Sequence, residues 1–390
     1  MKILKKLLKI LLFLVLIVVL LFIGLWASYA YFVSTEFPEL VESPEVGKWY
    51  AVPTSNAVCA NGEPLHGLYR KGKENKLMVY FYGGGVSIDP YMAARGFSVS
   101  PNEGFYSDVD PHYDYIVRLG ICNQSSDNPF KDWSIVAIPY FTGDFHIGTG
   151  DYPYVSLEGK NEVLRHHGFT NYRSILEKMK PYVGNPETLF ITGSSAGGFG
   201  ASLLADDVMD QFPETQNVTV FVDSSVLLTD KWPEVARDMW KAPEEIANSL
   251  VSDNIMVDGL KALYQHRGNK VKILFGCSAR DVELSKFQVY LNEGHFRKLA
   301  IPDAKRMQQN LKKTVADMQA SIPGCGIFIW DNFESFIDKG FTFHAITSIP
   351  YIFFEDRNGY GSIPQWLINA INGDIQTHGL ELLDKEIVID

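Results

Sequence analysis

The chain is 390 residues long, is 46% hydrophobic and carries a formal net charge of −11. This apolar content, which includes 25 phenylalanines, indicates a large buried core and excludes an intrinsically disordered protein. The acidic balance argues against nucleic acid as a partner, because a phosphate backbone requires a basic face on the protein that binds it.

An apolar segment near the N-terminus predicts a membrane or export signal. Residues 10–27 are uncharged and apolar, and as a helix they would approach the thickness of the hydrocarbon core of a bilayer. They follow a cluster of lysines: Lys2, Lys5, Lys6 and Lys9. No lysine or arginine follows until Lys48, which favours a location outside the cytoplasm for the rest of the chain. We therefore expect residues 1–30 to be a signal anchor that holds the protein at the membrane. The alternatives are a cleaved signal peptide, which would give a secreted protein, and a buried core helix.

Downstream of this segment, strand-like and helix-like segments alternate. Residues 31–75 are expected to be an extended lead-in, because prolines would interrupt any helix there. Six later runs are continuously apolar, as in strands buried on both faces: residues 77–82, 133–140, 189–192, 218–222, 271–275 and 327–330. Three intervening segments have the pattern of helices: residues 171–179, 197–212 and 304–318.

This alternation predicts an α/β fold, with a mostly parallel sheet and helices on both of its faces. The sequence shows no internal repeat and no low-complexity linker, so residues 31–390 are expected to form one domain. Residues 233–243 are expected to form part of a cap over the functional site.

Four cysteines are present: Cys59, Cys122, Cys277 and Cys325. An even number in an exported domain permits two disulfides, with three possible connectivities. The alternative is that they are small buried apolar residues. None of them lies in a CxxC motif or a Cys/His cluster, so the sequence gives little support to a zinc site.

The strongest functional signal is the sequence Gly193-Ser194-Ser195-Ala196-Gly197, which lies between a predicted strand and a predicted helix. A nucleophile elbow needs a sharp strand-to-helix turn, with glycines where side chains would collide with neighbouring elements. We expect Ser195 to be the nucleophile, with the N-terminus of the following helix favouring the developing negative charge. A turn of small residues that merely packs tightly is the alternative.

A serine nucleophile needs a base, and that base needs a carboxylate that orients it. In a fold with this elbow the chain order is serine, acid, histidine. We expect His344 to be the base, because it is a loop histidine bracketed by apolar residues, unlike the other histidines that follow the serine: His266, His295 and His378. Asp281, which comes just after the predicted strand 271–275, is expected to be the acid, and Asp223 is the alternative. Either carboxylate could instead cap a helix, and His344 could instead be a hydrogen-bonded core residue.

Acyl transfer also requires hydrogen-bond donors aimed at the oxyanion of the tetrahedral intermediate. The backbone N–H of Ala196, directly after the nucleophile, is expected to supply one donor. Gly84 and Gly85 follow the first apolar run and are expected to supply another, as in the glycine-rich loops of esterases. A phosphate-binding loop is a weaker interpretation, because no Lys-Ser or Lys-Thr pair completes it.

Taken together, these residues resemble the pectin acetylesterase family, to which the Notum carboxylesterases are related. The resemblance runs from about residue 65 to 355. Its motifs are Phe81-Tyr82-Gly83-Gly84-Gly85, Ile138-Pro139-Tyr140, Thr142-Gly143-Asp144-Phe145-His146-Ile147-Gly148, Gly168-Phe169-Thr170-Asn171, residues 193–198, Asp281 and His344-Ala345-Ile346-Thr347.

The resemblance implies an α/β-hydrolase fold, no cofactor, and a triad of Ser195, Asp281 and His344. It also implies hydrolysis of O-acyl esters. An O-acetyl ester on a carbohydrate such as pectin is the expected substrate. The alternatives are a carboxylesterase directed at lipids or proteins, and a catalytically inactive binding protein with the hydrolase fold.

The sequence also departs from the family pattern. Val86-Ser87-Ile88 stands where family members often have Ala-Cys-Trp, in a segment that shapes their acyl pocket. Phe141 replaces a family cysteine, which suggests a different set of disulfides. Asp144 and His146 match a Gly-Asp-x-His motif, which is expected to form a hydrogen-bonded structural turn beside the cleft; a metal site is the alternative.

Overall fold

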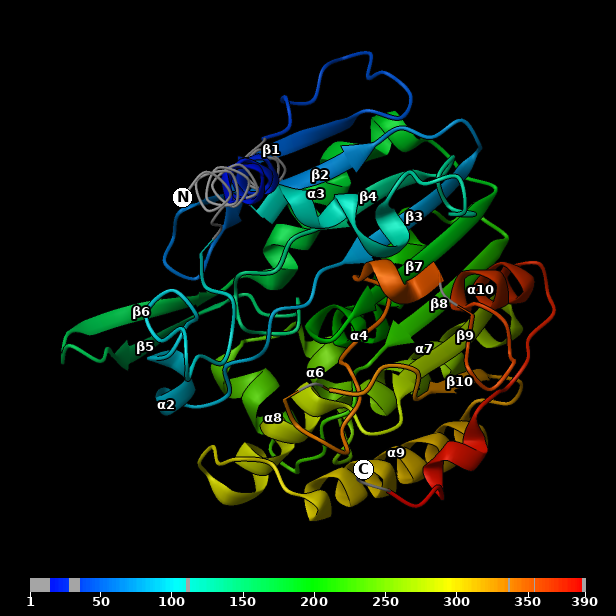
Figure 1. Cartoon of the computed structure of the whole chain (residues 1–390). Coiled ribbons are helices and arrows are strands. Elements are labelled where there is room, and N and C mark those ends of the chain that lie inside the picture. Colours follow the sequence, from blue (N-terminus) through cyan, green and yellow to red (C-terminus); the bar gives the residue numbers. More distant parts are fainter. Residues whose placement is uncertain (1–14, 28–35, 110–112, 336, 354, 388–390) are drawn as a thin grey trace, which may run out of the picture.

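The computed structural model describes residues 15–27, 36–109, 113–335, 337–353 and 355–387. Within this part of the chain, one sheet of eight strands crosses the molecule (Figure 1). The strands lie side by side in the order β1 (Trp49–Val58), β2 (Pro64–Arg70), β4 (Ser134–Ile138), β3 (Lys76–Phe81), β7 (Thr188–Ser194), β8 (Asn217–Asp223), β9 (Val271–Ser278) and β10 (Gly326–Trp330). The strands from β4 to β10 in this order are parallel, whereas β2 pairs antiparallel with both β1 and β4.

Helices cover both faces of this sheet. On one face, α4 (Ala196–Gln211) contacts β3, β7 and β8, and a Cβ atom on Gly193 would point into its first turn. On the other face, Trp366 of α10 (Ile363–Ile371) packs against Phe221. Phe221 lies in register with Thr192, the neighbour of Gly193, and neighbouring strand residues point to opposite faces. The predicted mostly parallel sheet with helices on both faces is therefore confirmed.

The remaining elements pack around this centre. Three short helices also occur: α2 (Pro90–Ala93), α5 (Trp232–Glu234) and α6 (Glu244–Ser249). The longer helices are α3 (Gly168–Val183), which contacts β1, β2 and β4, α7 (Ile255–Arg267), which contacts α4 and β9, and the pair α8 (Val282–Glu293) and α9 (Ile301–Ser321). A two-stranded hairpin, β5 (Gly150–Val155) and β6 (Asn161–His166), projects from the body of the molecule (Figure 1).

All six predicted strands and all three predicted helices are present, with boundaries shifted by a few residues. The agreement is closest for the central strands, because they are buried on both faces and read as continuous apolar runs. All seven residues of β7, for example, are buried.

The predicted lead-in of residues 31–75 contains two strands that the sequence did not reveal, β1 and β2. β1 is an edge strand whose alternation is weakened by Pro53 and by the polar residues that follow it. Proline is tolerated there because an edge strand leaves some of its N–H groups unpaired. The pairing of β1 with β2 is also irregular between Pro53 and Val58, which further disrupts the period-two pattern.

The apolar N-terminal segment is described only in part. Residues 15–27 are helical, and residues 10–14 of the predicted span lie outside the described residues. Within the described ranges, none of the helices has both the length and the apolar character needed to cross a membrane. The signal anchor expected for residues 1–30 therefore remains a prediction. The location of the domain outside the cytoplasm remains a prediction.

The expectation of two disulfides is wrong. Cys122, Cys277 and Cys325 carry free thiols. The fold keeps the cysteines in separate places: Cys277 lies within β9, Cys122 in a short 3-10 helix, and Cys59 in a small cluster that includes Phe141. The alternative interpretation, that these are mainly buried apolar residues, fits the structure.

Candidate active site

Ser195 occupies the turn between β7 and α4. Its φ of 56° and ψ of −125° lie in a region that residues other than glycine rarely adopt. Hydrogen bonds hold this conformation: Ser195 N donates to Asp223 O at 2.9 Å, and Ser195 O accepts from Gly198 N at 2.9 Å and from the Ser225 hydroxyl at 2.7 Å. The strained turn projects the serine side chain from the carboxyl end of the sheet, as a nucleophile elbow requires.

The elbow requires glycines at positions 193 and 197, because neighbouring backbone leaves no space for side chains there. A Cβ atom on Gly193 would lie 2.4 Å from the carbonyl oxygen of Gly197. A Cβ atom on Gly197 would lie 2.0 Å from the carbonyl oxygen of Phe81. Both distances are far below van der Waals contact, so side chains at these positions would push the elbow away from β3.

His344 and Asp281 form a hydrogen-bonded pair beside the serine. Nδ1 of His344 lies 2.8 Å from Oδ2 and 2.9 Å from Oδ1 of Asp281. Asp281 lies three residues after the end of β9 and is fully buried, and its carboxylate also caps α8 by accepting from Leu284 N at 3.0 Å. The two segments are held together through Thr342, whose N donates to Arg280 O at 2.9 Å and whose O accepts from Val282 N at 3.1 Å.

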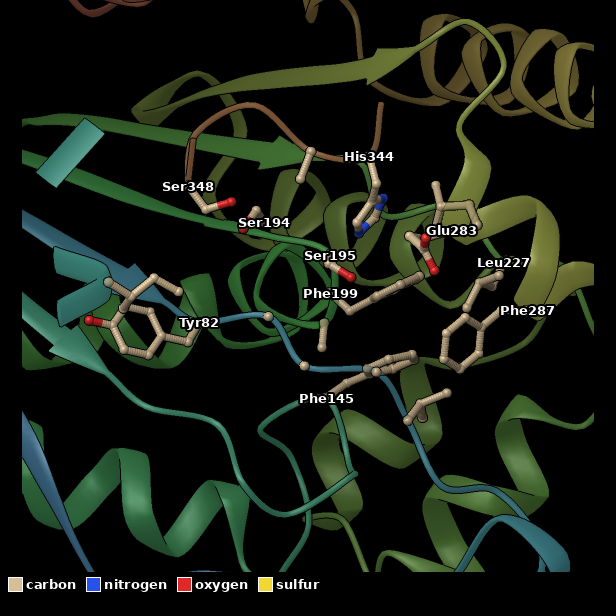
Figure 2. Close-up of a pocket in the computed structure, with 18 of the residues that line it drawn as sticks. Tyr82, Phe145, Ser194, Ser195, Phe199, Leu227, Glu283, Phe287, His344 and Ser348 are labelled. Carbon is tan, nitrogen blue, oxygen red and sulfur yellow. The ribbon is translucent and has the colours of Figure 1, made fainter. Parts of the chain in front are cut away.

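The surroundings of His344 raise its pKa above the ordinary value. Burial alone would lower the pKa, but the carboxylates of Asp281, Glu283 and Asp223 together outweigh that effect. Because Nδ1 of the imidazole faces a carboxylate, which can only accept, Nδ1 carries the hydrogen and Nε2 of the neutral ring is an acceptor. Figure 2 shows this ring lying beside the Ser195 hydroxyl.

Asp223, the alternative acid, has a different role in the structure. Its Oδ2 accepts from the N–H groups of Ile346 and Thr347 and from the Thr347 hydroxyl, each at 2.8 Å. Because Ser195 N donates to the backbone oxygen of the same residue, Asp223 connects the serine elbow to the loop that carries His344. Burial raises the pKa of the Asp223 carboxyl, and these donors partly offset that rise.

The other histidines after the serine lie elsewhere. Nδ1 of His266 pairs with Asp206 at 2.8 Å, Nδ1 of His295 lies 3.1 Å from the carbonyl oxygen of Glu293, and the ring of His378 stacks on Tyr360. The structure therefore brings Ser195, His344 and Asp281 to one end of the sheet, with Asp223 bonded to the loop, and leaves the other three histidines apart.

The loop after β3 is held by its carbonyl groups. Gly84 O accepts from Ser107 N at 2.8 Å, and Gly85 O accepts from the Tyr140 hydroxyl at 3.0 Å. These two bonds fix the orientation of the peptide groups in the loop. Side chains do not fit here, since a Cβ atom on Gly85 would lie 1.9 Å from Phe105 O.

The Gly-Asp-x-His motif supports the same loop. The carboxylate of Asp144 accepts from the Thr142 hydroxyl at 2.7 Å, from His146 N at 3.1 Å and from Gly168 N at 2.8 Å. Nε2 of His146 lies 2.8 Å from Tyr82 O. Burial lowers the pKa of His146 to about 4, so the ring is neutral and Nε2 donates to that carbonyl. The described residues contain no group of three or more His, Cys, Asp or Glu side chains placed to hold a metal ion.

A cavity of about 240 Å³ opens over these residues (Figure 2). Ser195, His344 and the glycine loop lie on its walls. Apart from these, its walls are mostly apolar, from Val86, Phe97, Ile116, Phe145, Phe199, Leu227, Leu284 and Phe287. Residues 233–243, the predicted cap, do not line the cavity. Trp240 from this segment packs against Phe145 instead, and so supports the wall from behind.

The sequence of this chain also matches a known protein family. The model of the pectinacetylesterase family matches residues 45–279, which is more than half of the chain. The chain belongs to the pectinacetylesterase family. Membership of this family supports a carboxylesterase-type hydrolase that acts on acyl groups.

One solved structure extends the likeness beyond that region. The Wnt deacylase Notum from Drosophila has a TM-score of 0.60 with this chain and 17% sequence identity, over 85% of this chain and 95% of that chain. At this identity the likeness shows the fold alone, which is the α/β-hydrolase fold. A comparison with curated proteins found no match.

The match to the pectinacetylesterase family ends before two of the residues described above. It includes Ser195 and the glycine loop, but Asp281 and His344 lie beyond residue 279. The hydrogen bonds between Asp281 and His344 therefore come from this structure and not from the family match.

Sequence reasoning missed several residues of the site in this pectinacetylesterase-family chain. The motif that contains Tyr140 gives no sign that its hydroxyl supports the glycine loop, and no sequence pattern predicts the apolar walls of the cavity. Glu283 also lines the cavity. The sequence feature that could have identified Glu283 is its position two residues after Asp281, in the first turn of α8.

Proposed function

We propose that this protein is a serine carboxylesterase in which Ser195 is the nucleophile, His344 the general base and Asp281 the residue that orients the base. The observation that carries this proposal is the pairing of His344 Nδ1 with both oxygens of a buried Asp281, in a cavity shared with the strained Ser195 turn. A base oriented in this way is what a serine needs in order to become a nucleophile.

In the proposed reaction, Ser195 Oγ attacks the carbonyl carbon of the ester while His344 Nε2 takes the hydroxyl proton. The tetrahedral intermediate collapses, the C–O bond to the alcohol breaks, and the imidazolium returns the proton to the leaving alkoxide. A water molecule then attacks the acyl-enzyme with His344 as base again, and this step releases the carboxylic acid and restores the serine.

The oxyanion of each tetrahedral intermediate is proposed to bind the N–H group of Ala196 and those of Gly84 and Gly85. Ala196 begins α4, so its N–H also lies at the positive end of the helix dipole. Loss of one such donor typically raises the barrier by about 2.7–4 kcal/mol.

Replacing Ser195 with alanine tests this proposal. Ser195→Ala is expected to abolish turnover of p-nitrophenyl acetate and covalent labelling by a fluorophosphonate. Ser126→Ala, at an exposed loop position, serves as the matched control. Turnover and labelling that persist in Ser195→Ala would refute the assignment. A folded wild-type protein that neither turns over esters nor reacts with the probe would instead indicate a binding protein with the hydrolase fold.

The acyl group is the second part of the proposal. The sequence favours an O-acetyl ester of a carbohydrate such as pectin, but the apolar cavity walls support a carboxylesterase for larger acyl groups, such as those of lipids. A buried apolar cavity of about 150 Å³ already binds benzene in another protein, and the cavity here is about 240 Å³. We expect kcat/KM for p-nitrophenyl esters to rise from acetate to medium-length acyl chains. A maximum at acetate would favour the acetylesterase.

A further inference from the structure

Glu283 contributes a partly exposed carboxylate to the wall of this largely apolar cavity. It lies in the first turn of α8, two residues after Asp281, and it lines the cavity together with Ser195 and His344. Figure 2 shows Glu283 beside His344 on the same wall. The described residues that line this cavity include no lysine or arginine. Apart from His344, which is a base, Glu283 is therefore the one charged side chain among them.

The position of Glu283 determines which part of an ester it faces. In ester hydrolysis the leaving alkoxide takes its proton from the imidazolium, so the alcohol portion must lie close to His344. A side chain that neighbours His344 is therefore close to the alcohol rather than deep in the acyl pocket. The same carboxylate helps to raise the pKa of His344, as expected for two groups on one wall of the cavity.

One neighbour partly balances this charge. Lys286 Nζ lies 2.8 Å from Oε1 of Glu283, and both side chains are more than one-third exposed. A pair this exposed is weak, because water and salt screen it and two long side chains lose freedom in forming it. An incoming cation can therefore replace the lysine, whereas an incoming anion meets the carboxylate without any basic group on the walls. Aromatic walls such as Phe287 also favour cations over anions.

We propose that this site selects its ester by the charge of the alcohol, accepting cationic and neutral alcohols and rejecting anionic ones, with Glu283 as the residue that discriminates. This inference rests on the proposed esterase function. It also makes an anionic polymer such as polygalacturonate a poor carrier of the ester. The substrate class is then an acyl ester of an uncharged or ammonium-bearing alcohol.

The test compares three esters of one acyl acid that differ only in the charge of the alcohol: an ester of choline, an ester of its uncharged carbon isostere, and an ester of an anionic hydroxyalkanoate. For the wild type, kcat/KM is expected to fall in that order, with a cation-to-anion ratio of about tenfold or more at low ionic strength. High salt is expected to reduce this ratio, because the carboxylate is partly exposed.

Two variants with opposite effects identify the residue. Glu283→Gln is expected to reduce the cation-to-anion ratio by about three- to tenfold and to move the acid limb of the pH profile to lower pH. Lys286→Gln is expected to increase the ratio, because it removes the partner of the carboxylate. Glu244→Gln changes the net charge equally at an exposed position outside the cavity, and it should leave the ratio unchanged. Thermal unfolding of each variant shows whether α8 stays folded.

The outcomes separate the two proposals. If wild type hydrolyses the neutral ester through Ser195 but Glu283→Gln keeps the same charge ratio, the charge selection is refuted and the esterase function stands. A preference for the anionic ester would refute it as well. If none of the three esters is hydrolysed and Ser195→Ala behaves like the wild type, both proposals fail.

Discussion

Two buried aspartates lie near the His344 loop, and their hydrogen-bond partners distinguish them. Asp281 accepts from the imidazole, whereas Asp223 accepts from the backbone of the loop that carries it. The same chemical group therefore orients a ring in one position and a loop in the other. The difference follows from which donors each strand end meets, because both residues are fully buried at the carboxyl ends of neighbouring strands.

At the residue scale we predict the effect of removing the Asp281 charge. Asp281→Asn keeps the shape of the side chain but no longer favours the tautomer with hydrogen on Nδ1, so kcat is expected to fall by about 10³–10⁴. The pH profile should change as well. Asp281 contributes to the raised pKa of His344, and the base works in its neutral form, so activity rises as pH passes upward through that pKa.

Without the carboxylate the pKa of His344 falls, and the acid limb of kcat/KM should move to lower pH. Measurement of kcat/KM against pH for the wild type and for Asp281→Asn checks the direction of this shift. An acid limb that stays in place or moves to higher pH would contradict the assignment of His344 as the base that Asp281 orients.

At the scale of elements, the loop after β3 is supported by three other segments of the chain. Its carbonyl groups at Tyr82, Gly84 and Gly85 accept from three donors that lie outside the loop. The donors come from positions 107, 140 and 146, so three separate parts of the chain fix the direction of its N–H groups. Preorganised donors stabilise charge without reorganising during the reaction, which is why the rigidity of this loop matters.

Tyr140→Phe tests this support. The hydroxyl donates to Gly85 O and accepts from Phe145 N at 2.9 Å, and burial raises the pKa of the phenol, which keeps it protonated as a donor. Its loss leaves buried polar groups unpaired, so the free energy of unfolding is expected to fall by about 1–3 kcal/mol.

We expect kcat of Tyr140→Phe to fall by about tenfold or more with little change in KM, since the oxyanion donors act mainly in the transition state. Tyr154→Phe removes a hydroxyl that pairs with Glu162 on the exposed hairpin, and it should leave kcat unchanged. A Tyr140→Phe enzyme with wild-type kcat would show that the loop holds its shape without this bond.

Across the whole molecule, stability comes from packing and not from cross-links. One large core cluster includes side chains from every strand of the main sheet, and at least three of the four cysteines carry free thiols. A domain of this size buries enough apolar surface to fold without disulfides.

We therefore predict that a reducing agent leaves the midpoint of thermal unfolding unchanged, whereas loss of a native disulfide would typically cost about 2–5 kcal/mol. Alkylation of the denatured, unreduced protein, followed by mass spectrometry, should add at least three alkyl groups per chain. A clear fall in the midpoint on reduction, or fewer than three alkyl groups, would show that cross-links form after all.

The parts of the fold that could be predicted are those whose signal is local in the chain. The central strands are buried on both faces and appear as continuous apolar runs, and the elbow appears as glycines around Ser195 because its turn leaves no space for side chains. The edge strand β1 was missed because partial exposure and Pro53 obscure its alternation.

The sequence by itself determined the α/β alternation, the elbow and a short list of candidate acids and bases, because backbone strain and burial act on neighbouring residues. Only the tertiary structure decided that Asp281, and not Asp223, pairs with His344. It also decided that the cysteines do not form two disulfides and that Glu283 lines the cavity. Each of these depends on which segments meet at the end of the sheet, and the order of strands in space differs from their order along the chain.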